Sequence, residues 1–171
     1  MKLLFFALVA LVLLSGCSSK SSSKHQVTLK PYKKLPKTDG PSYKLKSSDP
    51  IALALFDEYK KWDGTPYCYG GTSKDGVDCS ALVQRIFLDA FGVRVPRTTK
   101  RQIQTGYKIT KKEVKAGDMV FFKTGSTQRH SGIYLENGNF INTSSKYGVT
   151  LSNLNNPYWK AHYTQTRRVL P

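Results

Sequence analysis

The spacing of apolar residues changes once along this chain, near Lys115–Asp118, and this change limits the fold more than any other feature. Before it, apolar residues recur at helical spacing in two runs. After it, short apolar segments separated by turn residues are typical of strands. Helices that precede a set of antiparallel strands indicate an α+β fold. We therefore expect N-terminal helices packed on one antiparallel sheet.

Both helical runs carry signals for where a helix starts and stops. Asp49 is a favourable N-cap, and Pro50 fits the first helical position because no backbone N–H is needed there. The turn at Asp63-Gly64 ends this run. The second run follows a glycine-rich loop and stops at Gly92, a typical residue beyond a helix C-terminus. Its first turn is expected to hold Cys79.

The second half of the domain is expected to supply the strands. Glu136-Asn137-Gly138 lies between two apolar segments and therefore predicts a hairpin. The segments expected to form strands are Met119–Phe122, Gly132–Leu135, Phe140–Asn142, Gly148–Leu151 and Arg168–Leu170.

The first residues are typical of a secretion signal. Lys2 precedes an apolar run that ends at Leu14 and is too short to span a bilayer as a helix. The segment Leu14-Ser15-Gly16-Cys17 resembles the lipobox of bacterial lipoproteins, which implies removal of residues 1–16 and lipidation of Cys17. An ordinary signal peptide with an incidental cysteine is the alternative. Ser18 is typical of lipoproteins sent to the outer membrane, so we expect an outer-membrane lipid anchor that faces the periplasm.

Composition divides the rest of the chain into a tether and a domain. Residues 17–48 contain many Lys, Ser and Pro but few apolar residues, so they cannot bury a core and predict a disordered basic stalk. Residues 49–171 are long enough for one domain. The stalk would connect this domain to the membrane through the lipid on Cys17.

The chain is strongly basic, with 27 Lys and Arg against 11 Asp and Glu and a net charge of +16. Such a charge often accompanies nucleic-acid binding, but an exported protein tethered to a membrane rarely meets nucleic acid. Anionic lipid headgroups and the carboxylates of cell-wall peptides fit an exported protein better. The charge could also serve only solubility, and the sequence leaves both interpretations open.

Cys79 is the candidate nucleophile. At the first turn of a helix, the positive end of the helix dipole lowers a thiol pKa and favours the thiolate. Cys79 also precedes Leu82 and Val83 by three and four residues, which places it on the inward face of the helix. A disulfide between Cys68 and Cys79 is the alternative, and it would disable this nucleophile. No cysteine or histidine pair has metal-ligand spacing, so we expect no metal.

His130 is the candidate base for this thiol because it stands just before the first strand of the predicted hairpin. Asn142, on the second strand, could orient the His130 ring and fix its tautomer, as in other Cys-His-Asn sites. Gly132 would leave room between them. The alternative is that both are ordinary strand residues. His162 is expected to be a surface or packing residue.

The register of the hairpin decides whether His130 and Asn142 share a face. A two-residue turn at Asn137-Gly138 alone would place them on opposite faces. A three-residue loop with its glycine in a bulge shifts the pairing by one residue, so that Tyr134 faces Phe140. His130 and Asn142 then lie on one face. We predict this shifted register.

Several short motifs occur together, in the order and spacing of one known family. They are Gly64-Thr65-Pro66-Tyr67, Tyr69-Gly70-Gly71, Gly76-Val77-Asp78-Cys79-Ser80, Pro96-Arg97-Thr98-Thr99, Gly117-Asp118, Phe121-Phe122-Lys123-Thr124-Gly125, His130-Ser131-Gly132-Ile133-Tyr134 and Pro157-Tyr158-Trp159. Through them, residues 51–171 resemble the NlpC/p60 cell-wall cysteine peptidases, most closely the small lipoproteins of NlpC type.

The resemblance implies a papain-like α+β fold and hydrolysis of peptide bonds that involve the diamino acid of peptidoglycan stem peptides or cross-links, without a cofactor. It assigns Cys79 as the nucleophile, His130 as the base and Asn142 as the third polar residue. It assigns substrate contacts around the cleft to Tyr67, Asp78 and Ser80. The expected partners are peptidoglycan stem peptides and the membrane, with no nucleic acid, and we expect a monomer.

Two residues depart from the family pattern. Many relatives have His where this chain has Asn142, and Asn can orient a ring but cannot share its positive charge. Cys68 stands where a basic or aliphatic residue is more usual. A catalytically weak or inactive wall-binding lipoprotein therefore stays open as an alternative, as does an amidase or acyltransferase on the same fold. The sequence does not indicate which bond is cut.

Overall fold

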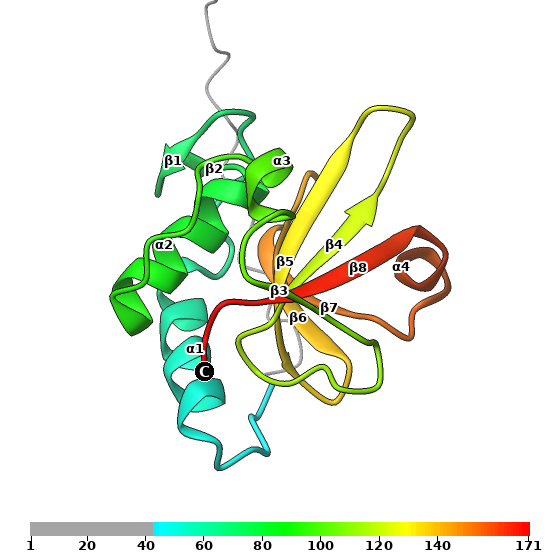
Figure 1. Ribbon diagram of the computed structural model, residues 1–171. Coiled ribbons are helices and arrows are strands. Elements are labelled where there is room, and N and C mark those ends of the chain that lie inside the picture. The colour runs from blue at the N-terminus through cyan, green and yellow to red at the C-terminus, as the bar shows by residue number, and fades with distance from the viewer. Residues whose placement is uncertain (1–42) are drawn as a thin grey trace, which may run out of the picture. The chain divides into compact units, whose positions relative to one another are not determined.

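The computed structural model describes residues 43–171 and shows helices beside one large sheet (Figure 1). The predicted signal peptide, the predicted lipidation site at Cys17 and most of the predicted stalk lie outside the described residues. Among residues 43–171, no helix is both long enough and apolar enough to cross a membrane.

Two long helices form where the sequence predicts them. Helix α1 spans Pro50–Trp62, and the Asp49 carboxylate accepts the backbone N–H of Ile51 at 2.9 Å. Helix α2 spans Cys79–Phe91 and ends at Gly92, which adopts a left-handed conformation with φ 66°. Both ends of α2 therefore follow from local chemistry: a carboxylate cap at the start and a residue without Cβ at the stop.

The strands form one antiparallel sheet in the order β3-β8-β4-β5-β6-β7, with every neighbouring pair antiparallel. A small second sheet, β1-β2, lies in the loop before α2. The strands are β1 Thr72–Ser73, β2 Gly76–Val77, β3 Tyr107–Ile109, β4 Met119–Lys123, β5 Arg129–Glu136, β6 Asn139–Ser144, β7 Gly148–Asn153 and β8 Tyr163–Arg168. The predicted α+β class, with N-terminal helices on an antiparallel sheet, is confirmed.

Side chains of the sheet alternate between two apolar clusters. In β4, Met119 and Phe121 join the large core that includes the inward faces of α1 and α2, whereas Val120 and Phe122 belong to a smaller cluster. Trp159 of helix α4, Pro157–His162, packs against that smaller cluster. In Figure 1, α1 and α2 lie on one side of the sheet, and α4 lies beside β8 on the other side of the view.

The predicted register of the β5–β6 hairpin is confirmed, but its origin differs from the prediction. Tyr134 pairs with Phe140, as expected. The turn itself has only two residues, Asn137 and Gly138, both with positive φ, between the paired Glu136 and Asn139. The irregularity lies between Tyr134 and Glu136 instead of in the turn. A bulge one residue inside β5 therefore shifts the pairing by one.

Gly132 makes this register possible where β5 and β6 approach each other. A Cβ at this position would lie 2.6 Å from the Ile141 carbonyl oxygen and 2.7 Å from the Phe140 ring. Neither neighbour can move easily, because one is backbone and the other is buried in the smaller cluster. Gly132 is therefore required by the close approach of β6, whereas its expected part in leaving room between His130 and Asn142 stays a prediction.

Two boundaries differ from the sequence prediction. Tyr43 and Leu45 were placed in the stalk, yet both pack against the large core, and Glu136 accepts the Tyr43 hydroxyl at 2.6 Å. Among the described residues, packing onto the domain is therefore already present at Tyr43, six residues before Asp49. The last strand was predicted at Arg168–Leu170, but it is β8, which follows directly on α4. The apolar tail Val169-Leu170 contacts the core after the strand has ended.

Helix α3, Thr99–Gln102, and helix α4 were not predicted. Four residues are too few for helical spacing to be visible in α3. Helix α4 did carry a signal, since the Asn156 side chain accepts the backbone N–H of Tyr158 and Pro157 occupies the first helical position.

Candidate active site

Cys79 is the first residue of α2 and lies at its N-terminal end. The carboxylate of Asp78 holds this end, because it accepts the backbone N–H of Ala81 at 2.7 Å. The Cys79 sulfur lies 3.7 Å from the Thr99 hydroxyl of α3, and that hydroxyl lies 3.5 Å from the Ser131 hydroxyl of β5. Three elements therefore position the thiol, while part of its surface stays exposed.

His130 of β5 acts directly on this thiol. Burial alone would raise the pKa of Cys79, but a hydrogen bond with His130 and the charge of its ring outweigh burial and lower the pKa from 9.0 to about 7. The backbone N–H of Ser131 and the hydroxyl of Thr99 lower it as well. A substantial fraction of Cys79 is therefore thiolate at neutral pH, and the structure brings the predicted nucleophile and base together.

Asn142 determines which nitrogen of His130 carries a proton. Its Nδ2 donates to the Thr150 carbonyl at 3.3 Å and to the Ser152 hydroxyl at 2.9 Å; since a carbonyl can only accept, this end of the amide is the nitrogen. Its Oδ1 then faces Nε2 of His130 at 3.3 Å and accepts the Nε2 proton. The ring's Nδ1 is left to exchange a proton with Cys79.

Two aromatic rings that the sequence did not single out as site residues hold the His130 ring. Trp159 stacks on it, with centroids 5.3 Å apart and planes at 26°. Phe122 lies 6.1 Å away, and both rings belong to the smaller apolar cluster or pack against it. The orientation of the imidazole therefore depends on packing as well as on the bond to Asn142.

Asp78 and Ser80, both buried, belong to a polar cluster centred on the half-buried Arg97. The guanidinium of Arg97 binds both carboxylate oxygens of Asp78, at 2.9 and 2.7 Å, and donates to the Ser80 hydroxyl at 3.0 Å. Burial alone would raise the pKa of Asp78, but the bonds from Arg97 and from the N–H of Ala81 lower it below its usual value. Asp78 is thus ionised and engaged on both oxygens.

This cluster adds a structural role to the two residues that were expected to contact substrate. Asp78 is the N-cap of α2, and Ser80 is buried beside it. Their contact with substrate stays a prediction, while their part in holding the start of α2 is visible in the geometry. The Arg97 guanidinium reaches the same loop by donating to the Gly70 carbonyl at 3.1 Å.

Tyr67 lies near enough to Cys79 and Asp78 for their charges to act on its phenol. Burial raises the pKa of its phenol, and the negative charges of Cys79 and Asp78 raise it further. The phenol therefore stays protonated and can act as a hydrogen-bond donor. Whether it contacts substrate is untested by this geometry and stays a prediction.

Cys68 and Cys79 are both free thiols, so the alternative of a disulfide between them is not adopted. Cys68 packs through its Cβ against the close backbone at Gly71 and Gly76. Its weak S–H donor lies 3.8 Å from the Tyr69 carbonyl. Cys68 is therefore a packing residue of the loop before α2 in this structure.

The remaining candidates lie away from the thiol. His162 packs against Tyr158 with ring centroids 4.3 Å apart, and its Nδ1 lies 2.7 Å from the Tyr158 carbonyl, as expected for a surface or packing residue. Within residues 43–171, no group of three His, Cys, Asp or Glu side chains is placed to hold a metal ion.

The site residues that the sequence did not identify are Arg97, Thr99, Phe122, Ser131 and Trp159. All five lie inside motifs quoted for the family resemblance, so a signal was present. Their roles depend on contacts between segments that are far apart in the chain. Arg97 and Asp78 are separated by 19 residues, and spacing alone gives no reason to join them.

The lowered thiol pKa gives a direct test of the Cys79–His130 pair. In a Cys68→Ala background, the rate of Cys79 alkylation by iodoacetamide is expected to rise with pH and reach half its maximum near pH 7, since only the thiolate reacts. In His130→Ala, burial still raises the pKa but the opposing interaction is gone, so the midpoint moves upward by more than about one pH unit. Mass spectrometry follows the reaction. An unchanged midpoint would mean that His130 does not act on this thiol.

The sequence and the structure both match known proteins. The model of the NlpC/P60 family matches residues 64–168. The murein DD-endopeptidase/LD-carboxypeptidase MepS of Escherichia coli is 36% identical over 172 residues, covering 96% of this chain and 90% of that protein. The probable endopeptidase NlpC of the same organism is 40% identical over 164 residues, covering 95% of this chain and 96% of that protein.

Solved structures agree with the sequence matches. A Staphylococcus aureus protein described as similar to lipoprotein, of the NLP/P60 family, superposes with a TM-score of 0.64 at 32% identity over 77% of this chain. An NlpC/P60 family protein from Bacillus cereus superposes with a TM-score of 0.63 at 31% identity over 70% of this chain. This chain spans less than half the length of these two structures, 45% and 40% respectively.

Proposed function

Because this chain belongs to the NlpC/P60 family, we propose that it is a cysteine peptidase that hydrolyses peptidoglycan, at stem-peptide or cross-link bonds that involve the diamino acid. The observation that carries the proposal is the pairing of Cys79 with His130, which lowers the thiol pKa to about 7. The names of the two Escherichia coli relatives, a murein endopeptidase and a probable endopeptidase, support the substrate class.

In the proposed reaction, the Cys79 thiolate attacks the carbonyl carbon of the scissile peptide bond, and the carbonyl oxygen becomes an oxyanion. The first backbone N–H groups of a helix have no partner inside the helix. Those of Cys79 and Ser80 lie at the start of α2, where the helix dipole also favours negative charge. They are the donors expected to stabilise the oxyanion.

His130 then completes the cycle. Its protonated ring gives a proton to the leaving amine, so that the C–N bond breaks and an acyl-enzyme thioester remains. Neutral His130 next removes a proton from water, which attacks the thioester and releases the acid and Cys79. The bond between Nε2 and Asn142 keeps Nδ1 directed at the reacting atoms through both steps.

Asn142 bears on the alternative of a weak or inactive wall-binding protein. It is fully buried and uses its amide to hold His130, Thr150 and Ser152 together. An amide that fixes a tautomer in this way supports acid–base chemistry, as in other Cys-His-Asn sites. We therefore favour an active peptidase over the inactive alternative.

Analysis of reaction products tests the proposal. Purified peptidoglycan digested to soluble muropeptides is incubated with the protein, and the products are identified by mass spectrometry. Hydrolysis adds one water and divides a muropeptide at a defined bond, so the product masses also name that bond. Protein pretreated with iodoacetamide is the control. Unchanged muropeptides with the untreated protein, across near-neutral pH, would contradict a peptidase, and release of an intact stem peptide from the sugar would indicate an amidase.

We further propose that the mature protein is a lipoprotein anchored through Cys17 in the outer membrane and facing the periplasm. The support is the sequence Leu14-Ser15-Gly16-Cys17 followed by Ser18. Cells fed labelled palmitate should incorporate label into the wild-type protein but not into Cys17→Ala. Equal labelling of both proteins would exclude this anchor.

A further inference from the structure

A hollow of about 510 Å³ lies beside the catalytic groups, between α3, the β4–β5 hairpin and the start of β8. Its size is within the range of ligand pockets. Neither Cys79 nor His130 lines it. The residues around it include Ile103, Phe122, Lys123, Thr127, Arg129 and Thr164. It therefore combines an aromatic ring, hydroxyl groups and two cations.

The two cations face each other directly. Lys123 of β4 pairs with Arg129 of β5 across the hairpin, so their side chains share one face of the sheet. Like charges at directly opposed positions destabilise a hairpin unless a counter-charge is present. The stability of the hairpin therefore does not explain why these two positively charged side chains lie together at one hollow.

No acidic side chain in the described part of the chain forms an ion pair with either residue. Other basic side chains do have such partners. The basic residues with an acidic partner are Lys60, Lys61, Arg85, Arg97 and Arg168. Lys123 and Arg129 are both exposed, so an anion from solution can reach them.

The hollow is continuous with the elements that hold Cys79. The Ser131 hydroxyl of β5 lies 3.5 Å from the hydroxyl of Thr99, which itself lies 3.7 Å from the Cys79 sulfur. Arg129 lies two residues before Ser131 on the same face of that strand. Two strand residues span roughly 7 Å. Thr99, which contacts the sulfur, begins α3, and Ile103 follows one helical turn later. A peptide whose scissile carbonyl lies at Cys79 therefore needs only a few further residues to reach the hollow.

We propose that Lys123 and Arg129 bind a free carboxylate of the substrate peptide in this hollow. Stem peptides of peptidoglycan carry free carboxylates, and Arg binds a carboxylate through two parallel hydrogen bonds. The anion would also remove the repulsion between the two cations. This inference rests on the proposed peptidase function and identifies a determinant of its specificity.

The experiment compares two forms of one substrate. The muropeptide found to be cleaved is prepared with its carboxylates free and with each carboxylate in turn converted to an amide. In the Lys123→Ala/Arg129→Ala variant, kcat/KM for the free acid is expected to fall roughly 10–100-fold, mainly through KM. For the peptide amidated at the recognised carboxylate, wild type and variant should differ less than about 3-fold. Arg129→Lys keeps the charge but loses the bidentate contact, so its kcat/KM for the free acid should lie between those of wild type and the double variant.

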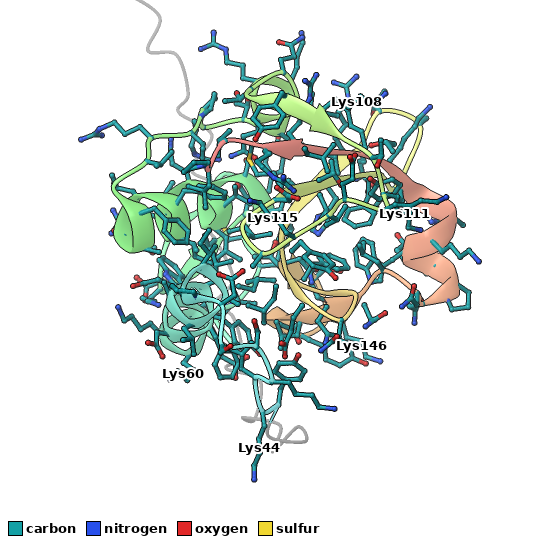
Figure 2. The ribbon with its side chains drawn as sticks, turned by 60° about the horizontal axis from the view of Figure 1, so that its bottom comes forward. Lys44, Lys60, Lys108, Lys111, Lys115 and Lys146 are labelled. Atoms are coloured by element: carbon teal, nitrogen blue, oxygen red, sulfur yellow. The ribbon has the colours of Figure 1, made fainter. Side chains whose placement is uncertain are left out.

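Lys44→Ala/Lys60→Ala is the matched control, since it removes the same charge from exposed positions. Figure 2 shows both lysines on the lower side of the view. This control is expected to change kcat/KM for the free acid less than about 2-fold, because exposed charges are screened by salt. An equal loss in the control would attribute the effect to net charge and overturn the proposal.

Two further results would overturn the inference while leaving the peptidase intact. One is a Lys123→Ala/Arg129→Ala variant that loses activity equally on free and amidated peptides. The other is a variant that keeps its preference for the free acid but loses binding to vesicles of anionic phospholipid. A wild-type protein that cleaves neither peptide would instead reject the proposed function. In that event, calorimetry tests the inference by itself. It compares binding of the free acid to Cys79→Ala with binding to Cys79→Ala that also carries Lys123→Ala and Arg129→Ala.

Discussion

Cys79→Ala is expected to lower kcat/KM for muropeptide hydrolysis by roughly 10⁴-fold or more, because it removes the thiolate that forms the acyl-enzyme. His130 and the backbone N–H groups at the start of α2 would still be present, but they act on a nucleophile that is gone. The substitution removes only the sulfur atom from a partly exposed position at the tip of α2. Thermal unfolding should therefore shift by no more than a few degrees.

Cys68→Ala is the matched control for this prediction, since it removes the other free thiol of the domain. The close contacts of Cys68 with Gly71 and Gly76 are made by its Cβ, which alanine retains. We expect kcat/KM within about 3-fold of wild type. The same loss in both variants would show that Cys68 is more than a packing residue. Residual cleavage by Cys79→Ala at the wild-type rate would assign the nucleophile elsewhere.

Local sequence chemistry predicted the elements of the fold more reliably than their junctions. Asp49-Pro50 and Gly92 set helix ends because each satisfies or removes a backbone requirement at its own position. The end of the chain was harder. Val169-Leu170 is apolar because it packs on the core after β8 has ended, and an apolar tail of this kind cannot be distinguished from a short strand by its pattern alone.

The hairpin shows how a register can be predicted for a partly wrong reason. The need to place His130 and Asn142 on one face indicated a shift of one residue, and that shift is present. The bulge was expected at Gly138, yet the turn is an ordinary two-residue one and the extra residue is buried Leu135. Strand alternation shows that one extra residue is needed to bring both side chains to the same face of the sheet. The position of that residue depends on packing in the folded chain.

The residues of the site also divide into those that local sequence predicts and those that depend on contacts between distant segments. Cys79, His130 and Asn142 could be predicted because each belongs to a residue type that the chemistry requires and lies at the end of a recognisable element. Arg97 and Trp159 could not be given roles, because their contacts with Asp78 and His130 join segments that are distant in the sequence. Such contacts leave no periodic signal. The position of Trp159 further depends on α4, which was not predicted.

The neighbours of Asn142 bear on whether an amide can take the place of the histidine that many relatives have at this position. An exposed amide at this position would orient His130 only weakly, since its two ends could exchange. Here Thr150 and Ser152 fix the direction of the amide, and burial excludes competing water. The lack of a second charge at this position therefore affects how strongly the His130 cation is stabilised, while its orientation is secured.

The largest effect on stability is expected from Arg168→Met, which breaks the ion pair between β8 and the start of β4. Arg168 Nε and Nη2 donate to the two carboxylate oxygens of Asp118, each at 2.7 Å, and both side chains are largely buried, at 13% and 1% exposed. Removing the cation leaves a buried carboxylate with only the Lys115 backbone N–H as donor. Loss of one partner of such a pair costs about 3–5 kcal/mol.

This cost is a large part of the stability of a domain of this size, so the thermal midpoint should fall by roughly 10–20 °C. The control is Arg85→Ala, which breaks the pair with Asp89 on α2, where the side chains are 46% and 33% exposed; it should cost less than about 1 kcal/mol. Asp118→Asn combined with Arg168→Met should be more stable than Arg168→Met alone, because it removes the unpaired charge but keeps an acceptor for Lys115. Equal midpoints for Arg168→Met and Arg85→Ala would show that the buried pair does not hold β8 to β4. Since the Asp118 carbonyl accepts the backbone N–H of Tyr134 in β5, loosening this junction should also disturb the strand that carries His130.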